Sequence, residues 1–106
     1  MTEKQLEQRL VRSVKNMGGI CPKWVSPGWD GAPDRMALLA GGRIAFIEVK
    51  RPGEKPRRLQ LLRHEQLRAL GFKVYVLDDE KQIPGIIREV TEENNGTNYN
   101  TAERTE

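Results

Sequence analysis

Three residues near the middle of the chain have the types and spacing needed for phosphoryl chemistry: Asp34, Glu48 and Lys50. Glu48 and Lys50 lie at the end of an apolar run that begins at Ile44, which predicts a buried strand. Because side chains alternate along a strand, these two residues share one face. A charged pair on a buried strand is costly unless something compensates it. The spacing therefore predicts a polar site rather than an ordinary core.

The position of Asp34 depends on the hairpin that joins two apolar runs, residues 36–40 and 44–49, through Gly41-Gly42. A three-residue loop or a G1-type bulge places Asp34 across from Glu48, on the same face. A tight Gly-Gly turn would instead place Asp34 across from Val49. We expect the looser turn, since it brings the two carboxylates together.

Two carboxylates and one ammonium group are what a metal-dependent hydrolase requires. Carboxylate oxygens hold Mg²⁺, which polarises a phosphoryl oxygen and lowers the pKa of an attacking water. A nearby lysine orients that water or stabilises charge on the phosphate. The alternative is an exposed cluster of Asp, Glu and Lys at a strand end, because Glu-x-Lys is common by chance.

The pieces Pro33-Asp34 and Glu48-Val49-Lys50 resemble the PD-(D/E)xK nuclease signature, and the sequence around them is similar to its VRR-NUC branch. The similarity spans about residues 3 to 80, in order. The further matching segments are Gly18-Gly19, residues 23–28, 31–35, 41–50, Leu59-Gln60 and 67–74.

The resemblance implies a metal-dependent endonuclease that acts as a homodimer on branched DNA such as four-way (Holliday) junctions. It implies Mg²⁺ or Mn²⁺ as the cofactor, with no nucleotide cofactor. The implied metal-binding residues are Asp34, Glu48, Val49 and Glu7, and the implied catalytic residues are Asp34, Glu48, Lys50, Glu7 and Gln60. Gln60 is expected to hydrogen-bond to Lys50 or to a phosphate. For Glu7, the alternative is an exposed acidic residue near a helix N-terminus, where negative charge is favoured.

Two rival functions remain. A DNA-binding module could keep the fold without catalysis, although a binder has no reason to retain a buried charged triad. A nuclease for flapped or plain duplex DNA would carry the same motif.

Hydrophobic spacing outlines the elements around this site. It predicts a helix over 3–16 with Thr2 as N-cap, a strand over 20–25 and a loop over 26–33. After the hairpin it predicts a helix over 57–70, with Leu59, Leu62, Gln66, Leu67 and Leu70 on one face, a strand over 72–77 and a short helix over 79–90. With the resemblance, this gives an α/β fold, a restriction-endonuclease-like mixed sheet flanked by helices in the order α-β-β-β-α-β.

Basic and loop residues beside the carboxylates are candidates for DNA contacts. These are Lys23, Ser26, Trp29, Arg35, Arg51, Lys55, Arg57 and Arg58. Phosphate binding is the natural use of such a cationic stretch, and a solvated basic surface is the alternative. Trp29 could stack on a base or cover the core. His64, the only histidine, is expected at the surface or facing DNA.

Composition indicates one domain, residues 1–90, followed by a disordered polar tail over 91–106. The chain carries +3 and the tail −3, so residues 1–90 carry +6, which favours a polyanionic partner. We expect no membrane association and a cytoplasmic location, since neither a signal peptide nor an apolar span is evident. Cys21 is expected to be a buried free thiol.

Overall fold

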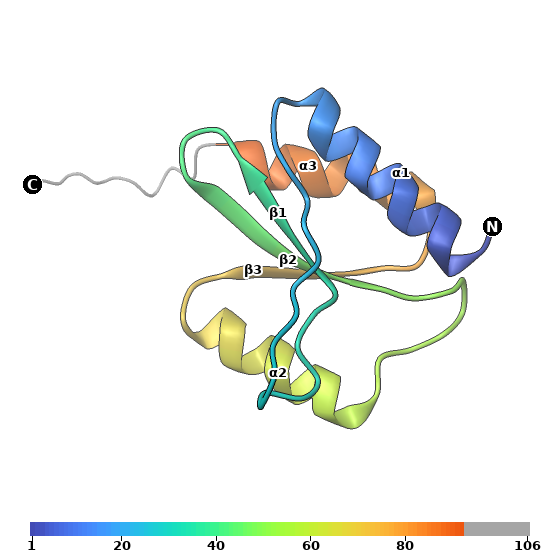
Figure 1. Cartoon of the computed structure of the whole chain (residues 1–106), viewed down its shortest axis with the longest axis vertical. Helices are drawn as coiled ribbons and strands as arrows, with labels where there is room; N and C mark the ends of the chain where they lie inside the picture. The colour runs from blue at the N-terminus through green and yellow to red at the C-terminus, as the bar shows by residue number, and fades with distance from the viewer. Residues whose placement is uncertain (93–106) are drawn as a thin grey trace, which may run out of the picture.

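The computed structural model describes residues 1–92, and its centre is a mixed three-stranded sheet (Figure 1). The elements, in chain order, are α1 (Glu3–Asn16), β1 (Arg35–Leu39), β2 (Arg43–Val49), α2 (Arg58–Ala69), β3 (Lys73–Leu77), the 3-10 helix η1 (Glu80–Gln82) and α3 (Ile83–Thr91). β2 pairs with β1 antiparallel and with β3 parallel. The predicted α/β fold is confirmed. The tail was predicted from residue 91, but Thr91 is the last residue of α3; the part of the predicted tail beyond residue 92 lies outside the described residues.

The sheet separates two layers of helices. α1 and α3 lie on one side and α2 lies on the other (Figure 1). Side chains along β2 alternate between the two sides of the sheet. Ala45, Ile47 and Val49 pack in the core beneath α1 and α3, whereas Phe46 packs in a separate cluster with Leu67 of α2. Within the described residues no helix is both long and apolar enough to span a membrane.

The hairpin has the looser turn that the site requires. Arg35 pairs with Ile47 and Leu39 pairs with Arg43, which leaves the three residues Ala40, Gly41 and Gly42 in the loop. Gly41 and Gly42 have φ of 83° and 72°, a conformation that glycine adopts without strain. Continued by one residue, the register sets Asp34 opposite Glu48, as predicted.

Residues 20–25 lie beside β1 without forming the continuous strand that we expected. Ile20 bridges Leu38 and Lys23 bridges Arg35, each as an isolated antiparallel pair. Between them the carbonyl of Pro22 accepts the Met36 N–H at 3.0 Å, but proline has no N–H to return. The segment thus keeps its place in the predicted order as an edge strand that Pro22 interrupts.

The prediction for the buried face of α2 was confirmed at Leu67 and wrong for the other residues. The helix buries Gln60, His64 and Leu67, whereas the leucines Leu59, Leu61, Leu62 and Leu70 are 41%, 47%, 47% and 75% exposed. Positions 60, 64 and 67 follow the i, i+4, i+7 spacing of one helix face. Apolar spacing alone predicts the leucines as the buried face, because it gives no weight to polar residues such as Gln60 and His64. This polar face is buried because Gln60 and His64 contact the carboxylate of Glu48 on β2.

The other helices follow the sequence closely. Thr2 caps α1 by accepting the Gln5 N–H at 3.1 Å, and the Gln5 side chain accepts the Thr2 N–H at 2.8 Å, a reciprocal capping box. Asp79 caps η1. The helix predicted over 79–90 is divided at Ile83, where α3 begins with Pro84 in its first turn.

Candidate active site

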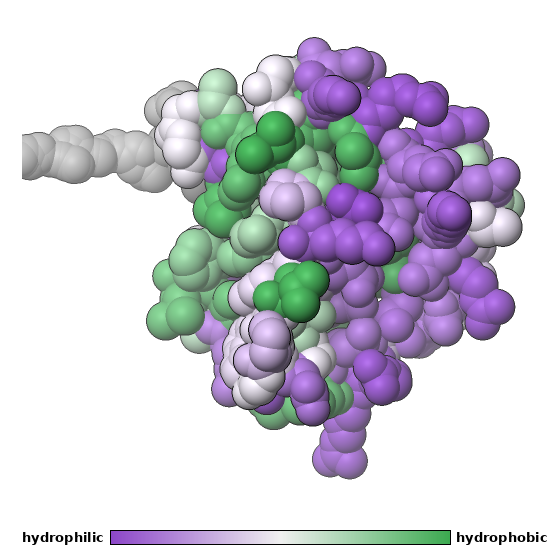
Figure 2. Space-filling model, viewed as in Figure 1, coloured by the Kyte–Doolittle hydropathy of each residue, from purple (hydrophilic) through white to green (hydrophobic). Residues whose placement is uncertain are grey.

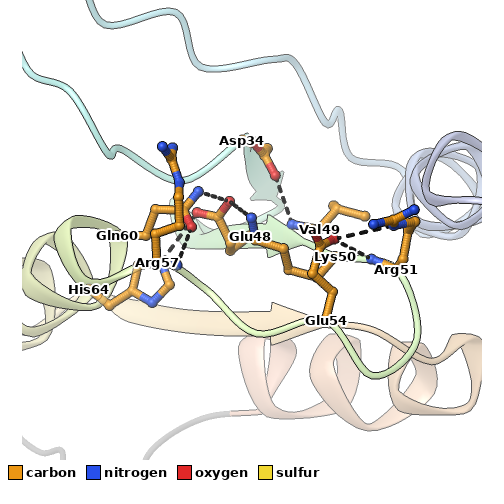
Figure 3. A network of polar contacts seen from close by, with 9 residues as sticks. All are labelled: Asp34, Glu48, Val49, Lys50, Arg51, Glu54, Arg57, Gln60 and His64. Carbon is orange, nitrogen blue, oxygen red and sulfur yellow. Dashed lines mark hydrogen bonds and ion pairs between the residues drawn. The ribbon is translucent and has the colours of Figure 1, made fainter.

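Asp34 is fastened to the end of β2 by the backbone. Its Oδ2 accepts the N–H of Val49 at 2.8 Å (Figure 3). This N–H lies beyond the last pair of the β1–β2 ladder, in which Arg35 meets Ile47. Asp34 therefore takes the place of the next ladder partner, and this bond holds its carboxylate beside β2.

Glu48 is 1% exposed, and both of its carboxylate oxygens have partners from α2. Gln60 Nε2 donates to Oε2 at 2.8 Å, and His64 Nε2 lies 3.3 Å from Oε1 (Figure 3). Gln60 and His64 are one helical turn apart, so they approach the carboxylate from the same side. The helix thereby fixes the orientation of the carboxylate plane.

Gln60 has a second role that sets the direction of its amide. Its Oε1 accepts the Arg57 N–H at 2.7 Å, which caps the first turn of α2, so its amide nitrogen is turned toward Glu48. We had expected Gln60 to contact Lys50 or a phosphate. In the structure the oxygen of the Gln60 amide is bound to the N-terminus of α2, and its nitrogen is bound to the carboxylate of Glu48.

His64 is fully buried, so the surface or DNA-facing position predicted for it was wrong. Its Nδ1 has no hydrogen-bond partner in the structure as described. An orphaned N–H is costly to bury, so we assign the proton to Nε2, where it donates to Glu48. Burial, and then the charge of Arg68, lower the pKa of His64, which favours this neutral form. The spacing of Gln60, His64 and Leu67 was the signal in the sequence.

The environment of Glu48 disfavours its charge when no cation is bound. Burial and the neighbouring Asp34 raise the pKa of Glu48 to about 8, against the opposing charges of Lys50 and Arg57. Lys50 is the nearest ammonium group, with its Nζ 3.9 Å from Glu48 Oε2. Two adjacent carboxylates that repel each other form a favourable place for a divalent cation.

The carboxylates at this site are the kind of ligand preferred by the cation that the sequence implies. In residues 1–92 no cluster of three or more His, Cys, Asp or Glu could hold a metal, so the side chains that this site offers to a cation are the pair Asp34 and Glu48. Mg²⁺ binds proteins through one or two carboxylates and keeps several waters, whose places substrate phosphates can take. The pair therefore fits a Mg²⁺-type ion and lacks the soft or nitrogen ligands that zinc prefers.

Two residues predicted to bind metal have other contacts. Glu7 Oε2 accepts the Arg35 Nε–H at 2.7 Å, and the Arg35 guanidinium also donates to the Cys21 carbonyl at 2.6 Å. The backbone N–H of Val49 binds Asp34. A metal-binding role for Glu7 and Val49 stays a prediction. Cys21 is buried as expected, and burial raises the pKa of its thiol to about 11.

The residues predicted to contact DNA divide into two groups. Arg35 is engaged with Glu7, and Trp29 packs on Trp24 with Arg63 stacked over its ring at 4.7 Å, so both stabilise the fold. Ser26 is partly buried in the loop that it opens. The remaining candidates are exposed: Lys23, Arg51, Lys55, Arg57 and Arg58. Figure 3 shows Arg51 and Arg57 on either side of Glu48 and Lys50.

A mixed sheet that presents this carboxylate pair and lysine defines a nuclease of the restriction-endonuclease-like class. No family model matches the chain. The comparisons with solved structures and with curated proteins both support this class. A solved structure described as a VRR_NUC domain is similar with a TM-score of 0.77 and 33% identity, over 81% of this chain and 94% of that one.

A curated relative is 50% identical over 78 residues, which are 74% of this chain and 84% of the relative. It is described as "Putative nuclease p44" from Acyrthosiphon pisum secondary endosymbiont phage 1. The chain belongs to the VRR-NUC nuclease family.

Proposed function

We propose that this nuclease is a Mg²⁺- or Mn²⁺-dependent endodeoxyribonuclease that cuts branched DNA as a homodimer. The observation that carries the proposal is the Asp34–Glu48 pair. One carboxylate is held by a backbone N–H and the other by two side chains of a capped helix, at the edge of a basic surface. Such preorganisation is typical of a catalytic cation site.

Each residue has a distinct part in the proposed reaction. Asp34 and Glu48 would hold the cation, which when bound would polarise the phosphoryl oxygen and lower the pKa of the attacking water. Lys50, whose side chain is 13% exposed, would orient that water or stabilise charge on the phosphate. Gln60 and His64 keep Glu48 in place. Arg51 and Arg57, which lie on either side of Glu48 and Lys50 in Figure 3, would bind phosphates beside the scissile bond.

We propose a homodimer because resolving a four-way junction requires one cut in each of two strands. Each chain supplies one Asp34–Glu48 pair, so symmetric cutting of two strands of a junction needs two copies. A two-fold dimer matches a two-fold substrate. The charge of +6 on residues 1–90 favours a nucleic acid as a polyanionic substrate, and membership of the VRR-NUC nuclease family makes DNA the expected polymer.

The decisive experiment incubates the full-length chain and Glu48→Gln with four-way, flapped, nicked and linear DNA, with Mg²⁺, with Mn²⁺ or with EDTA. We expect cation-dependent cleavage by the wild type, fastest on the four-way junction, and none by the variant. Binding without cleavage under every condition would instead support the rival DNA-binding module. Equal rates on all four substrates would contradict branch selectivity but leave the metal-dependent nuclease intact. Sedimentation of the same samples tests the dimer.

A further inference from the structure

A second basic surface lies away from α2, in a groove between α1 and residues 20–25. The groove has a volume of about 790 Å³, and the cations that line it are Lys4, Arg12, Lys15, Lys23 and Arg35. Its acidic residues are Glu3 and Glu7, and Glu7 is neutralised by Arg35. We call this feature the α1 groove. Its unbalanced charge is positive, contributed chiefly by exposed lysine and arginine side chains.

The cations from α1 form a row along the helix. Lys4 and Lys15 are eleven residues apart, which is close to three turns, and Arg12 lies three residues before Lys15, so the three project on the same side of the helix. At 1.5 Å per residue the row extends roughly 16 Å. Throughout residues 1–92 no ion pair is recorded for Lys4, Arg12 or Lys15, whereas Arg9 of the same helix is paired with Glu80 at 2.6 Å. A row of unpaired like charges suits a polyanion.

The α1 groove begins close to the catalytic carboxylates. Lys23 bridges Arg35, which directly follows Asp34. The side chains of Asp34 and Arg35 leave β1 on opposite faces, so the groove lies on the α1 side and the carboxylates lie on the α2 side. Figure 1 shows α1 and α2 on opposite sides of the sheet, and Figure 2 shows a hydrophilic surface over the region of α1. Two basic surfaces therefore flank one catalytic centre.

We propose that the α1 groove binds the phosphate backbone of a second arm of the DNA substrate. That arm leaves the catalytic centre on the α1 side, while the arm being cut is held by the arginines at the start of α2. Duplex DNA is stiff over about 150 base pairs, so a straight duplex would have to bend sharply to reach both sides of the sheet. Arms that diverge at a branch reach both without bending. This inference rests on the proposed function and gives it a structural basis for branch selectivity.

The test compares the double variant Arg12→Gln/Lys15→Gln with the matched control Lys81→Gln/Arg88→Gln. The control removes two exposed cations of η1 and α3 that lie outside the α1 groove. Binding of the full chain to a four-way junction and to a linear duplex of equal length is measured by fluorescence anisotropy in EDTA, from 50 to 200 mM salt. Cleavage rates in Mg²⁺ are measured on the same substrates.

We expect the groove variant to lose affinity for the junction and to keep that for the duplex. Losing two phosphate contacts lowers the salt slope by about 1.8, so between 50 and 200 mM its junction affinity should fall about tenfold less than that of the wild type. An equal loss on junction and duplex, or a loss no greater than in the control, would overturn the assignment. A wild type that neither binds nor cuts any DNA would instead refute the proposed function itself.

Discussion

The two faces of the sheet are packed in opposite ways. Beneath α1 and α3 the buried residues are all apolar or nearly so, with Leu10, Ile47 and Leu77 fully enclosed. Toward α2 the apolar cluster is small, and the buried residues beside it include Glu48, Gln60 and His64. Apolar burial contributes about 25 cal/mol per Å², whereas a buried carboxylate destabilises the fold. The face beneath α1 and α3 thus stabilises the domain, and this stability offsets the cost of burying the Glu48 carboxylate on the α2 side.

The largest contrast should come from Glu48→Gln, which keeps the shape of the side chain and removes its charge. We expect cleavage in Mg²⁺ to fall by about 10³-fold or more, equivalent to about 4 kcal/mol of transition-state stabilisation. The free energy of unfolding in EDTA at pH 8 should stay constant or rise, because the buried charge is gone. Urea titrations and single-turnover kinetics on one preparation measure both. Lost activity that comes with a large loss of stability would contradict the division between the faces.

The opposite result is expected for Leu10→Ala on the apolar face. Removing a fully buried leucine should lower the free energy of unfolding by about 2–5 kcal/mol, and cleavage per folded molecule should remain close to wild type. Leu62→Ala is the matched control, because Leu62 is 47% exposed on α2 and its loss should cost less than about 1 kcal/mol. Equal effects from the two leucines would mean that the outer face of α2 is covered in solution.

His64 sharpens the comparison because it acts on the metal site through Glu48. With His64→Leu the hydrogen bond to Oε1 is lost, and we expect affinity for Mg²⁺ to fall about 10–100-fold, as is usual for residues that orient a metal ligand. His64→Gln can restore a donor and should recover part of the loss. Calorimetric titration with Mg²⁺ gives the affinity independently of cleavage. Leu and Gln variants with the same affinity would show that His64 only fills space.

These residues also show what the sequence could predict. The strand pair and the capped α1 follow from local patterns, namely the apolar runs and Thr2. Gly41-Gly42 marks the turn but allows two lengths, and the three-residue form was chosen because it brings Asp34 and Glu48 together. The buried face of α2 did not follow from local patterns, because its choice is made by Glu48, twelve residues from Gln60 along the chain. A helix with exposed leucines and a buried histidine makes sense only once the carboxylate opposite is known. Tertiary contacts, rather than propensity, decided that element.

The raised pKa of Glu48 predicts how stability depends on pH without metal. The folded state binds this proton up to about pH 8, whereas the unfolded chain releases it near 4.5. Between those values the folded state holds more protons, so the contribution of Glu48 to stability falls as pH rises. Thermal unfolding in EDTA from pH 5 to 8.5 should show this decline, and Glu48→Gln should lack it. Mg²⁺ should restore stability at pH 8, since a ligand that binds only the folded state stabilises it.

The smallest effect is expected at Glu7, which lies in α1 and lines the α1 groove. Its carboxylate holds Arg35 at 2.7 Å, with side chains 20% and 16% exposed, so the ion pair stabilises the fold by about 1 kcal/mol or less. If positioning Arg35 is its role, Glu7→Gln keeps a hydrogen-bond acceptor for the guanidinium and cleavage should fall only about threefold or less. If Glu7 instead binds a second cation, the same change should raise the Mg²⁺ concentration needed for half-maximal rate by about tenfold or more. Cleavage measured over a range of Mg²⁺ concentrations separates the two roles, because only a metal ligand shifts the midpoint.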